Sequence, residues 1–290
     1  MTNITNIAVL SDIHGNYCAL KRCVELALEK NVKIFLFLGD YVGDLGYPQK
    51  TMEYLYALKQ QYTCYFIRGN KENYWLDYKK NGGHGWDDHH STTGTLLYTY
   101  QNLTEKDFSF FESLPHKRDI LFEGFPPLTI CHGSPDKINE HLQPGDQHTL
   151  AIMDQEKNTL ILNGHTHIQA SIEHNGKRLL NAGSAGIPLH SGGKAQFMIL
   201  HGADRSWEHE FFTLEYDVET VISDLYSAGL DKKAPYWCRI TENLLRKGTP
   251  SHGAVLERAM FLCRRQTGRC QWPDIPEACW EQAFSEMVTT

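Results

Sequence analysis

No purely apolar run in the 290-residue sequence exceeds five residues, as in residues 34–38. A transmembrane helix needs about 20 apolar residues in succession, so the sequence predicts none. Residues 1–7 contain no basic residue and no long apolar stretch, and we therefore expect no signal peptide there. The eight cysteines form no C-x-x-C pair, which argues against a disulfide framework and favours free thiols in the cytoplasm.

The sequence also lacks an excess of positive charge. Its 28 Lys and Arg residues stand against 35 Asp and Glu residues, which gives a net charge of −7. Broad binding to nucleic acid or to an anionic membrane is therefore not expected. A phosphate-bearing substrate stays open, because bound metal ions can supply positive charge locally.

What the sequence does contain is a sizeable apolar fraction and many histidines. Hydrophobic residues make up 41% and charged residues 22%, which is the balance of a folded globular protein. The length suits one large domain or two small ones. Histidine occurs 15 times and is the commonest metal ligand, so the positions of these residues decide what they mean.

The first third of the chain predicts successive strand–helix steps. Mainly apolar segments at residues 7–10, 32–38 and 64–67 are the expected strands. Helices are expected after Asn16, which suits an N-cap, and from Pro48, which suits a first helical position. This succession indicates a parallel sheet flanked by helices, an α/β fold.

Later segments predict a second sheet and a helical tail. Strand-like runs at residues 128–131, 160–162, 178–180, 196–200 and 210–214 are closely spaced, which suggests hairpins and a more antiparallel sheet. After about Tyr216 the apolar spacing becomes helical. We therefore divide the chain into residues 1–216 and a helical extension, 217–290. The apolar stripes of that extension pack either on the core or at an interface between copies of the chain.

Side chains suited to metal binding follow the predicted strands. Asp12 and His14 come after the first strand, Asp40 after the second and Asn70 after the third. The carboxyl ends of parallel strands meet at one edge of a sheet, where α/β folds place ligand sites. Carboxylate, imidazole and amide ligands together suit Mn, Fe, Zn or Co rather than Ca or Mg. Later strands add three more histidines: His132, His165 and His167.

The segments around these residues resemble a known family. In chain order they are SDIHGN (11–16), GDYVGD (39–44), RGNKE (68–72), CHG (131–133) and GHTH (164–167), and together they resemble the signature of the calcineurin-like metallophosphoesterases. The looser matches NAGSAGIP (181–188) and FFESLP (110–115) look like the bacterial phosphodiesterase branch of that superfamily. The resemblance spans about residues 7–216 and implies an αββα sandwich of two packed sheets with helices outside.

The resemblance also implies a site for two divalent transition-metal ions. Asp12, His14, Asp40 and His167 would hold the first ion, and Asp40, Asn70, His132 and His165 would hold the second, so that Asp40 bridges them. A hydroxide shared by two ions about 3.5–4 Å apart would attack the phosphoester. The metals considered are Mn, Fe, Zn, Co and Ni, with Mn favoured. Asp44 is expected to orient a ligand histidine.

One residue departs from the family pattern. The motif Gly-Asn-His-Asp/Glu reads Gly-Asn-Lys-Glu here, so Lys71 stands where many members carry a histidine. In those members the histidine is thought to assist the leaving group or to bind the phosphate. We expect Lys71 to stabilise negative charge in the transition state without being needed for metal loading. The donor of the leaving group's proton stays open.

Other residues near these motifs are candidates for substrate binding. Arg68 either holds a phosphate bidentately or forms an ordinary surface ion pair. In the polar loop 82–94, Trp86 is a candidate for stacking on a base, and His89 or His90 for replacing the missing acid. The alternative is a polar loop with no role.

These features predict a metal-dependent phosphoesterase whose small substrate is a phosphodiester or a nucleotide-type phosphoanhydride, for instance a dinucleoside polyphosphate. Good leaving groups are expected, because they need less acid assistance. One alternative is a phosphoprotein or small-molecule phosphomonoesterase. The other is a non-catalytic scaffold of the same fold, which is disfavoured because all seven expected ligand positions carry competent residues.

Overall fold

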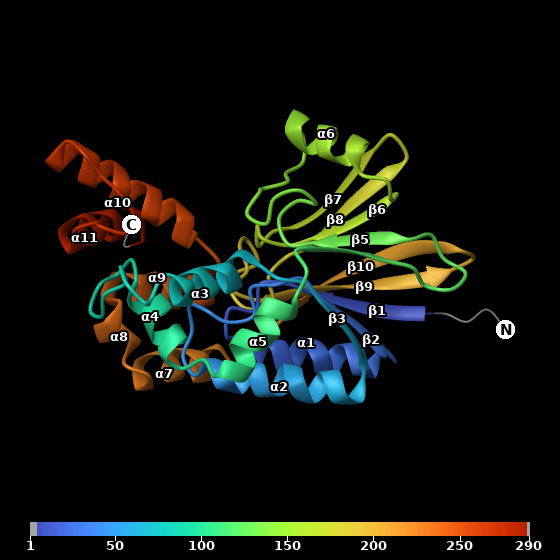
Figure 1. Cartoon of the computed structure of the whole chain (residues 1–290), viewed down its shortest axis with the longest axis horizontal. Helices are drawn as coiled ribbons and strands as arrows, with labels where there is room; N and C mark the ends of the chain where they lie inside the picture. Colours follow the sequence, from blue (N-terminus) through green and yellow to red (C-terminus); the bar gives the residue numbers. More distant parts are fainter. Residues whose placement is uncertain (1–4, 289–290) are drawn as a thin grey trace.

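The computed structural model describes residues 5–288 and contains two five-stranded sheets packed face to face, with helices on the outside (Figure 1). This arrangement confirms the predicted two-sheet α/β sandwich with a helical C-terminal region. Residues 1–4, part of the segment in which we expect no signal peptide, lie outside the described residues. Within residues 5–288, no helix is both long and apolar enough to span a bilayer.

The first sheet is built on the predicted N-terminal strands. Its order is β10-β9-β1-β2-β3, and β1, β2 and β3 are parallel to one another. The hairpin β9–β10 joins it antiparallel to β1. The bounds are β1 Thr5–Leu10, β2 Ile34–Phe37, β3 Thr63–Phe66, β9 Ala195–Ala203 and β10 Ser206–Leu214.

The second sheet differs from the expectation of a mainly antiparallel one. Its order is β4-β5-β6-β8-β7, in which β5, β6 and β8 are parallel and only the two edge strands are antiparallel. The last two predicted strands, at 196–200 and 210–214, belong to the first sheet instead. The bounds are β4 Lys117–Ile120, β5 Leu128–Cys131, β6 Leu160–Asn163, β7 Gln169–His174 and β8 Lys177–Ala182.

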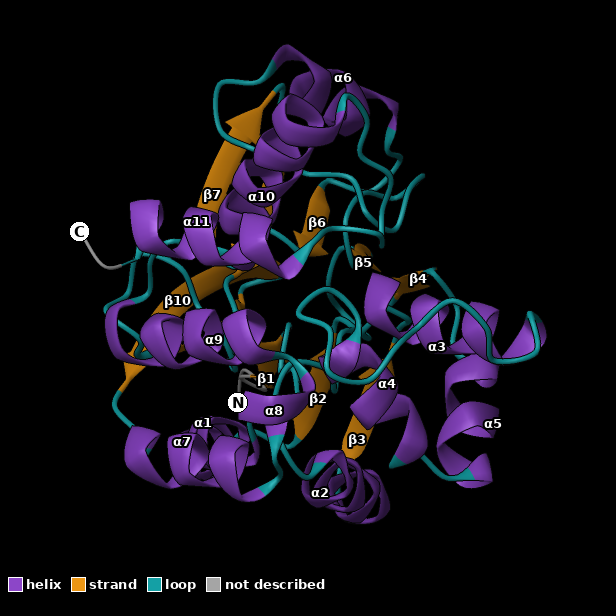
Figure 2. Ribbon diagram, turned by 90° about the vertical axis from the view of Figure 1, so that its left-hand side faces the viewer, coloured by secondary structure: helices purple, strands orange, loops and turns teal. Residues whose placement is uncertain are grey.

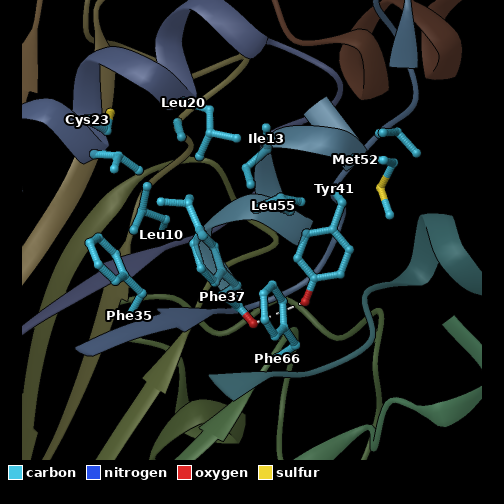
Figure 3. Close-up of a cluster of buried hydrophobic side chains, with 14 of the residues drawn as sticks. Leu10, Ile13, Leu20, Cys23, Phe35, Phe37, Tyr41, Met52, Leu55 and Phe66 are labelled. Carbon is cyan, nitrogen blue, oxygen red and sulfur yellow. Dashed lines mark hydrogen bonds between the residues drawn. The ribbon is translucent and has the colours of Figure 1, made fainter. Parts of the chain in front are cut away.

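Alternation along the strands produces two separate apolar layers. In β1, Ile7 and Val9 face the second sheet, whereas Ala8 and Leu10 face the outer helices. The outer layer includes Phe37, Tyr41 and Phe66, and the Tyr41 hydroxyl donates to the Phe37 carbonyl oxygen at 3.2 Å (Figure 3). Asn16 caps α1 by accepting from the Ala19 N–H at 3.0 Å, as its position predicts. The helices of this part are α1 Tyr17–Glu29, α2 Pro48–Gln61, α3 Asn70–Lys80, α4 Gly94–Gln101, α5 Glu105–Ser113 and α6 Gln147–Gln155.

The C-terminal helices lie at the end of the sandwich to which the first strands point (Figures 1 and 2). The bounds are α7 Val218–Ser227, α8 Leu230–Lys233, α9 Pro235–Lys247, α10 His252–Thr267 and α11 Glu277–Met287. Buried side chains of α7–α9 pack with Leu45, Tyr98 and Ile187 of the preceding part. Helices α9–α11 share a core of their own around the fully buried Trp280. The extension therefore packs on the sandwich through α7–α9.

Candidate metal centre

Both sheets deliver polar side chains to one place, at the carboxyl ends of their parallel strands. The first sheet supplies Asp12 and His14 after β1, Asp40 after β2, and Asn70 as the first residue of α3. The second sheet supplies His132 after β5, and His165 and His167 after β6. The structure thus brings together all seven of the residues that the motifs single out.

One group of donor atoms forms around Asp12, His14 and His167, whose ligand atoms lie within 4.8 Å of one another. The Nε2 atom of His167 lies 3.2 Å from Asp12 Oδ1 and 3.2 Å from His14 Nε2. Asp40 borders this group, because its Oδ2 is 3.7 Å from His14 Nε2.

The second group consists of Asp12, Asp40 and His132, again within 4.8 Å. The Nε2 atom of His132 lies 3.5 Å from Asp40 Oδ1 and 3.0 Å from Asn70 Oδ1. His165 stands beside it, with ring centroids 5.0 Å apart. Asp12 is common to both groups, and Asp40 reaches both through its two oxygens.

The hydrogen-bond partners of His132 and His167 indicate which ring nitrogen of each is available to a metal ion. The Nδ1 atoms of His132 and His167 contact the carbonyl oxygens of Leu38 and Ile187 at 2.7 and 3.0 Å. A carbonyl can only accept, so Nδ1 carries the hydrogen and Nε2 keeps its lone pair when the ring is neutral. Asp12 Oδ1 is buried and has no hydrogen-bond partner among residues 5–288, so a cation could bind this oxygen. The donor set therefore fits divalent transition metals.

The backbone at this centre adopts conformations that L-residues rarely use. Five of the seven candidate ligands have positive φ: Asp12 (54°), His14 (51°), Asp40 (54°), His165 (66°) and His167 (59°). Each such residue costs about 1–3 kcal/mol, and the cost persists only where the surrounding structure enforces it. The strand ends are thus bent to bring the side chains together.

Close backbone contacts hold this geometry. A Cβ on Gly69 would lie 2.2 Å from Asp40 Oδ1, and one on Gly39 would lie 2.4 Å from the Gly69 nitrogen. Glu72 braces the same point by accepting from the N–H groups of Gly69, Asp40 and Tyr41 at 2.8, 3.0 and 2.9 Å. Burial and the nearby Asp40 carboxylate raise the pKa of Glu72 to about 7.

The charges of the centre are mutually dependent. Burial disfavours charge on His14 and His132, yet the facing carboxylates outweigh it and raise the pKa of His14 to about 9 and that of His132 to about 10. Burial and the neighbouring His132 lower the pKa of His165 to about 3. The carboxylates thus favour the protonated form of His14 and His132. Bound metal ions would compete with these protons for the ring nitrogens.

A comparison with known families identifies this arrangement. The calcineurin-like phosphoesterase superfamily domain matches residues 5–205, more than two thirds of the chain. The chain belongs to that superfamily. The family assignment suggested by the motifs is therefore confirmed.

Relatives of this phosphoesterase domain cover nearly the same length. An uncharacterized protein of Methanocaldococcus jannaschii is 25% identical over 249 residues, which are 80% of this chain and 94% of that one. Solved structures of a hypothetical protein from Pyrococcus horikoshii and of a metallophosphoesterase from Sphaerobacter thermophilus superpose with TM-scores of 0.72 and 0.67, at 22% and 21% identity. Each covers 85% of this chain and 100% of its own, which shows a shared fold.

Asp44 connects the phosphoesterase centre to the C-terminal helices. Its Oδ2 lies 2.7 Å from His14 Nδ1, and its Oδ1 accepts from Lys71 Nζ at 3.2 Å and from Trp237 Nε1 at 2.8 Å. Burial opposes its charge, but Lys71 and His14 outweigh it and hold the pKa of Asp44 well below its usual range. Trp237, on α9, was not expected from the sequence because it lies 193 positions from Asp44.

A cavity of about 260 Å³ opens over the centre. Five metal donors line it, namely His14, Asp40, Asn70, His165 and His167, together with Asp44 and Lys71, and we call this part of the lining the inner side. Its outer side carries mainly apolar and aromatic side chains from α3, α4 and the C-terminal region: Tyr74, Leu96, Trp237, Leu256 and Trp272. His252 of α10 also lines it and stacks on Trp237, with ring centroids 4.4 Å apart.

Apart from Lys71, none of the residues predicted to bind substrate is among the described residues that line the cavity. Arg68 donates to the carbonyl oxygens of Glu112 and Leu114 at 3.0 and 3.1 Å, which ties its guanidinium to the end of α5. Trp86 stacks on Tyr78 with centroids 3.9 Å apart. As far as residues 5–288 show it, the cavity lining includes neither Arg68 nor the three loop candidates Trp86, His89 and His90.

One histidine without a ligand-spaced partner in the sequence does reach the centre. His141 is exposed, and its ring meets that of His165 edge-on with centroids 4.6 Å apart. Burial and His167 lower the pKa of His141. Only the loop that follows β5 brings it there, so no local sequence pattern identifies it.

Proposed function

We propose that the protein is a metal-dependent phosphoesterase that hydrolyses a phosphodiester or a nucleotide-type phosphoanhydride. The observation that carries this proposal is the convergence of all seven competent donor side chains at one centre, five of which line the cavity above it. The same completeness argues against the non-catalytic scaffold of the same fold. A cavity of about 260 Å³ suits a small substrate better than a phosphoprotein.

The chain's own residues would share the work as follows. Asp12, His14, Asp40 and His167 would hold one divalent ion, and Asp40, Asn70, His132 and His165 the other. Bound ions supply a nucleophile at neutral pH and neutralise phosphoryl charge. Manganese is our first choice among Mn, Fe, Zn, Co and Ni. Asp44 orients His14, since it contacts Nδ1, the ring atom opposite the ligand atom.

Lys71 supports the choice of substrate class. It lines the cavity next to Asn70, and its ammonium group lies 3.2 Å from Asp44. This position lets it stabilise negative charge on the phosphoryl group or on the departing oxygen. Burial opposes charge on this lysine, but Asp44 and Asp40 outweigh it and raise its pKa, so it stays a cation. Esters with good leaving groups should therefore be preferred, because they need no proton donor.

The test is a substrate panel on metal-stripped protein reloaded with Mn²⁺, Co²⁺, Ni²⁺, Zn²⁺ or Mg²⁺. It includes phosphomonoesters, activated diesters, cyclic nucleotides, dinucleoside polyphosphates and a phosphopeptide. We expect activated diesters and phosphoanhydrides to be hydrolysed fastest. A panel led by the phosphopeptide or by alkyl monoesters would refute the substrate class, and no metal-dependent hydrolysis at all would favour the scaffold.

A further inference from the structure

Two exposed aromatic side chains of the molecule face the cavity over the metal centre. Tyr74 is 41% exposed and Trp272 is 42% exposed, and both line the cavity. Within the described chain they are two of five large hydrophobic residues that are at least 41% exposed. Aromatic surface left open in a concave site is typical of ligand recognition.

Their places in the chain put these rings just beyond the reacting end of the cavity. Tyr74 follows Asn70 by one turn of α3, so the two side chains share a helix face. Trp272 comes from the connection between α10 and α11 in the C-terminal extension. A substrate whose phosphate reaches Asn70 would therefore have its next group beside Tyr74.

Hydrogen bonds join the segments that surround these rings. Trp280 Nε1, on α11, donates to Thr92 Oγ1 at 3.1 Å, and Glu277 accepts from the Ser91 N–H and hydroxyl, both at 2.7 Å. Ser91 and Thr92 are both buried. These contacts attach the C-terminal helices to the segment before α4, which lines the cavity through Thr92, as α4 does through Thr95.

The chemistry of this outer half defines its ligand. Besides the rings it offers Leu96 and Leu256 and the hydroxyls of Thr92 and Thr95. The charged groups of the lining, Asp40, Asp44 and Lys71, all belong to the inner half. The outer half therefore suits a flat, uncharged group with hydrogen-bonding edges.

We propose that Tyr74 and Trp272 bind the nucleobase of a nucleotide-type phosphodiester, so that the C-terminal extension selects the substrate. This inference rests on the proposed phosphoesterase function. Stacking on aromatic rings accepts any base, because every base has a π-face. The enzyme should thus require a nucleoside next to the phosphate and discriminate weakly between bases.

The test compares two diesters with the same leaving group on the Mn²⁺-loaded protein: thymidine 5′-(p-nitrophenyl phosphate) and methyl p-nitrophenyl phosphate. We expect Trp272→Ala and Tyr74→Ala each to lower kcat/KM for the nucleoside diester by about tenfold, mainly through KM. Hydrolysis of the methyl diester should be unchanged. Trp272→Phe should restore most of the loss, and Phe261→Ala, which removes an equally exposed ring of α10 outside the cavity, should have no effect.

A second readout does not depend on turnover. Calorimetric titration with thymidine 5′-monophosphate should show binding that Trp272→Ala weakens by about tenfold, whereas binding of inorganic phosphate should be unaffected. Equal losses on both diesters, or equal affinity of the wild type and the two alanine variants for the nucleotide, would overturn the inference. Absence of hydrolysis for both diesters, with nucleotide binding intact, would instead overturn the phosphoesterase proposal.

Discussion

Lys71 contacts a metal donor, Asp40, as well as Asp44 and the Trp237 ring of the C-terminal helices. Its backbone N–H donates to Asp40 Oδ1 at 2.8 Å, and its ammonium group donates to Asp44. The side chain is a cation 5.8 Å from the centroid of the Trp237 ring. It therefore adds positive charge to the cavity without supplying an atom to either group of metal donors.

Replacing Lys71 by methionine should separate these roles. We expect Lys71→Met to lower kcat by about 100-fold, the usual loss for a group that stabilises transition-state charge. Metal content, measured by mass spectrometry of the reloaded protein, should stay that of the wild type. Lys79→Met on the same helix, which removes an ion pair with Glu105 and a cation–π contact with Phe108 away from the cavity, is the matched control. Loss of metal together with activity in Lys71→Met would show that the lysine supports the centre itself.

Asp44 is predicted to act through His14 rather than on the substrate. Asp44→Asn keeps the shape but removes the carboxylate that faces His14 Nδ1 and Lys71. We expect the affinity for Mn²⁺ to fall by about 10- to 100-fold, as is usual when a partner of a ligand histidine is removed. Titration of the metal-stripped protein measures this. Trp237→Phe removes one of the three side-chain contacts of Asp44 and should lower the Mn²⁺ affinity by less. Unchanged Mn²⁺ affinity in Asp44→Asn would contradict the assignment.

At the scale of elements, α9 and α10 contact the site through a stacked pair of rings, the half-buried Trp237 and the buried His252. His252 stacks on Trp237, and its Nε2 contacts Thr241 Oγ1 at 2.8 Å. The Thr241 hydroxyl donates to the Trp237 carbonyl oxygen, so Nε2–H is the donor to Oγ1. Burial, with Lys71 nearby, lowers the pKa of His252 to about 3, although Asp44 opposes this shift.

We expect His252 to make the free energy of unfolding depend on pH. The folded pKa of His252 lies below its unfolded value of 6.5, so below pH 6.5 the unfolded chain takes up a proton that the folded chain excludes. The contribution is about 1.4 kcal/mol of lost stability for each pH unit below 6.5, down to the folded pKa. Urea unfolding of the wild type and of His252→Gln at pH 7 and pH 5 should show the wild type losing about 2 kcal/mol more than the variant. A difference that is the same at both pH values would contradict the assignment.

Element by element, the sequence predicted what local patterns determine. The strands before Asp12 and Asp40 contain continuous apolar runs, and the strand before His132 is apolar except for Thr129. The cap of α1 and the proline start of α2 also lie where expected. Helix α3 was not expected, because Trp75 and Tyr78 make no regular stripe and its start is braced by Glu72 contacts with distant N–H groups. The prediction of which sheet β9 and β10 join was also wrong, because the spacing of two strands in the sequence does not determine which sheet their hairpin joins.

At the scale of the whole molecule, the sequence predicts the residues of the inner half of the cavity but not those of the outer half. The metal donors lie in short motifs at strand ends, so strand order alone predicts that they converge. Tyr74, Trp237 and Trp272 carry no motif, and they reach the site only through the packing of α3 and the C-terminal helices. The loop residue Trp86 has the right chemistry for stacking but packs on Tyr78 instead.

The central claim is that this cavity holds two divalent ions on the chain's own carboxylates and histidines. The most direct test is the metal stoichiometry of chelator-stripped protein after titration with Mn²⁺, read by mass spectrometry beside diester hydrolysis. We predict two ions per chain in the wild type, impaired binding in His132→Ala, and hydrolysis that appears only as Mn²⁺ is restored. A wild-type chain that binds no ion, or that hydrolyses the diester fully after stripping, would contradict the account.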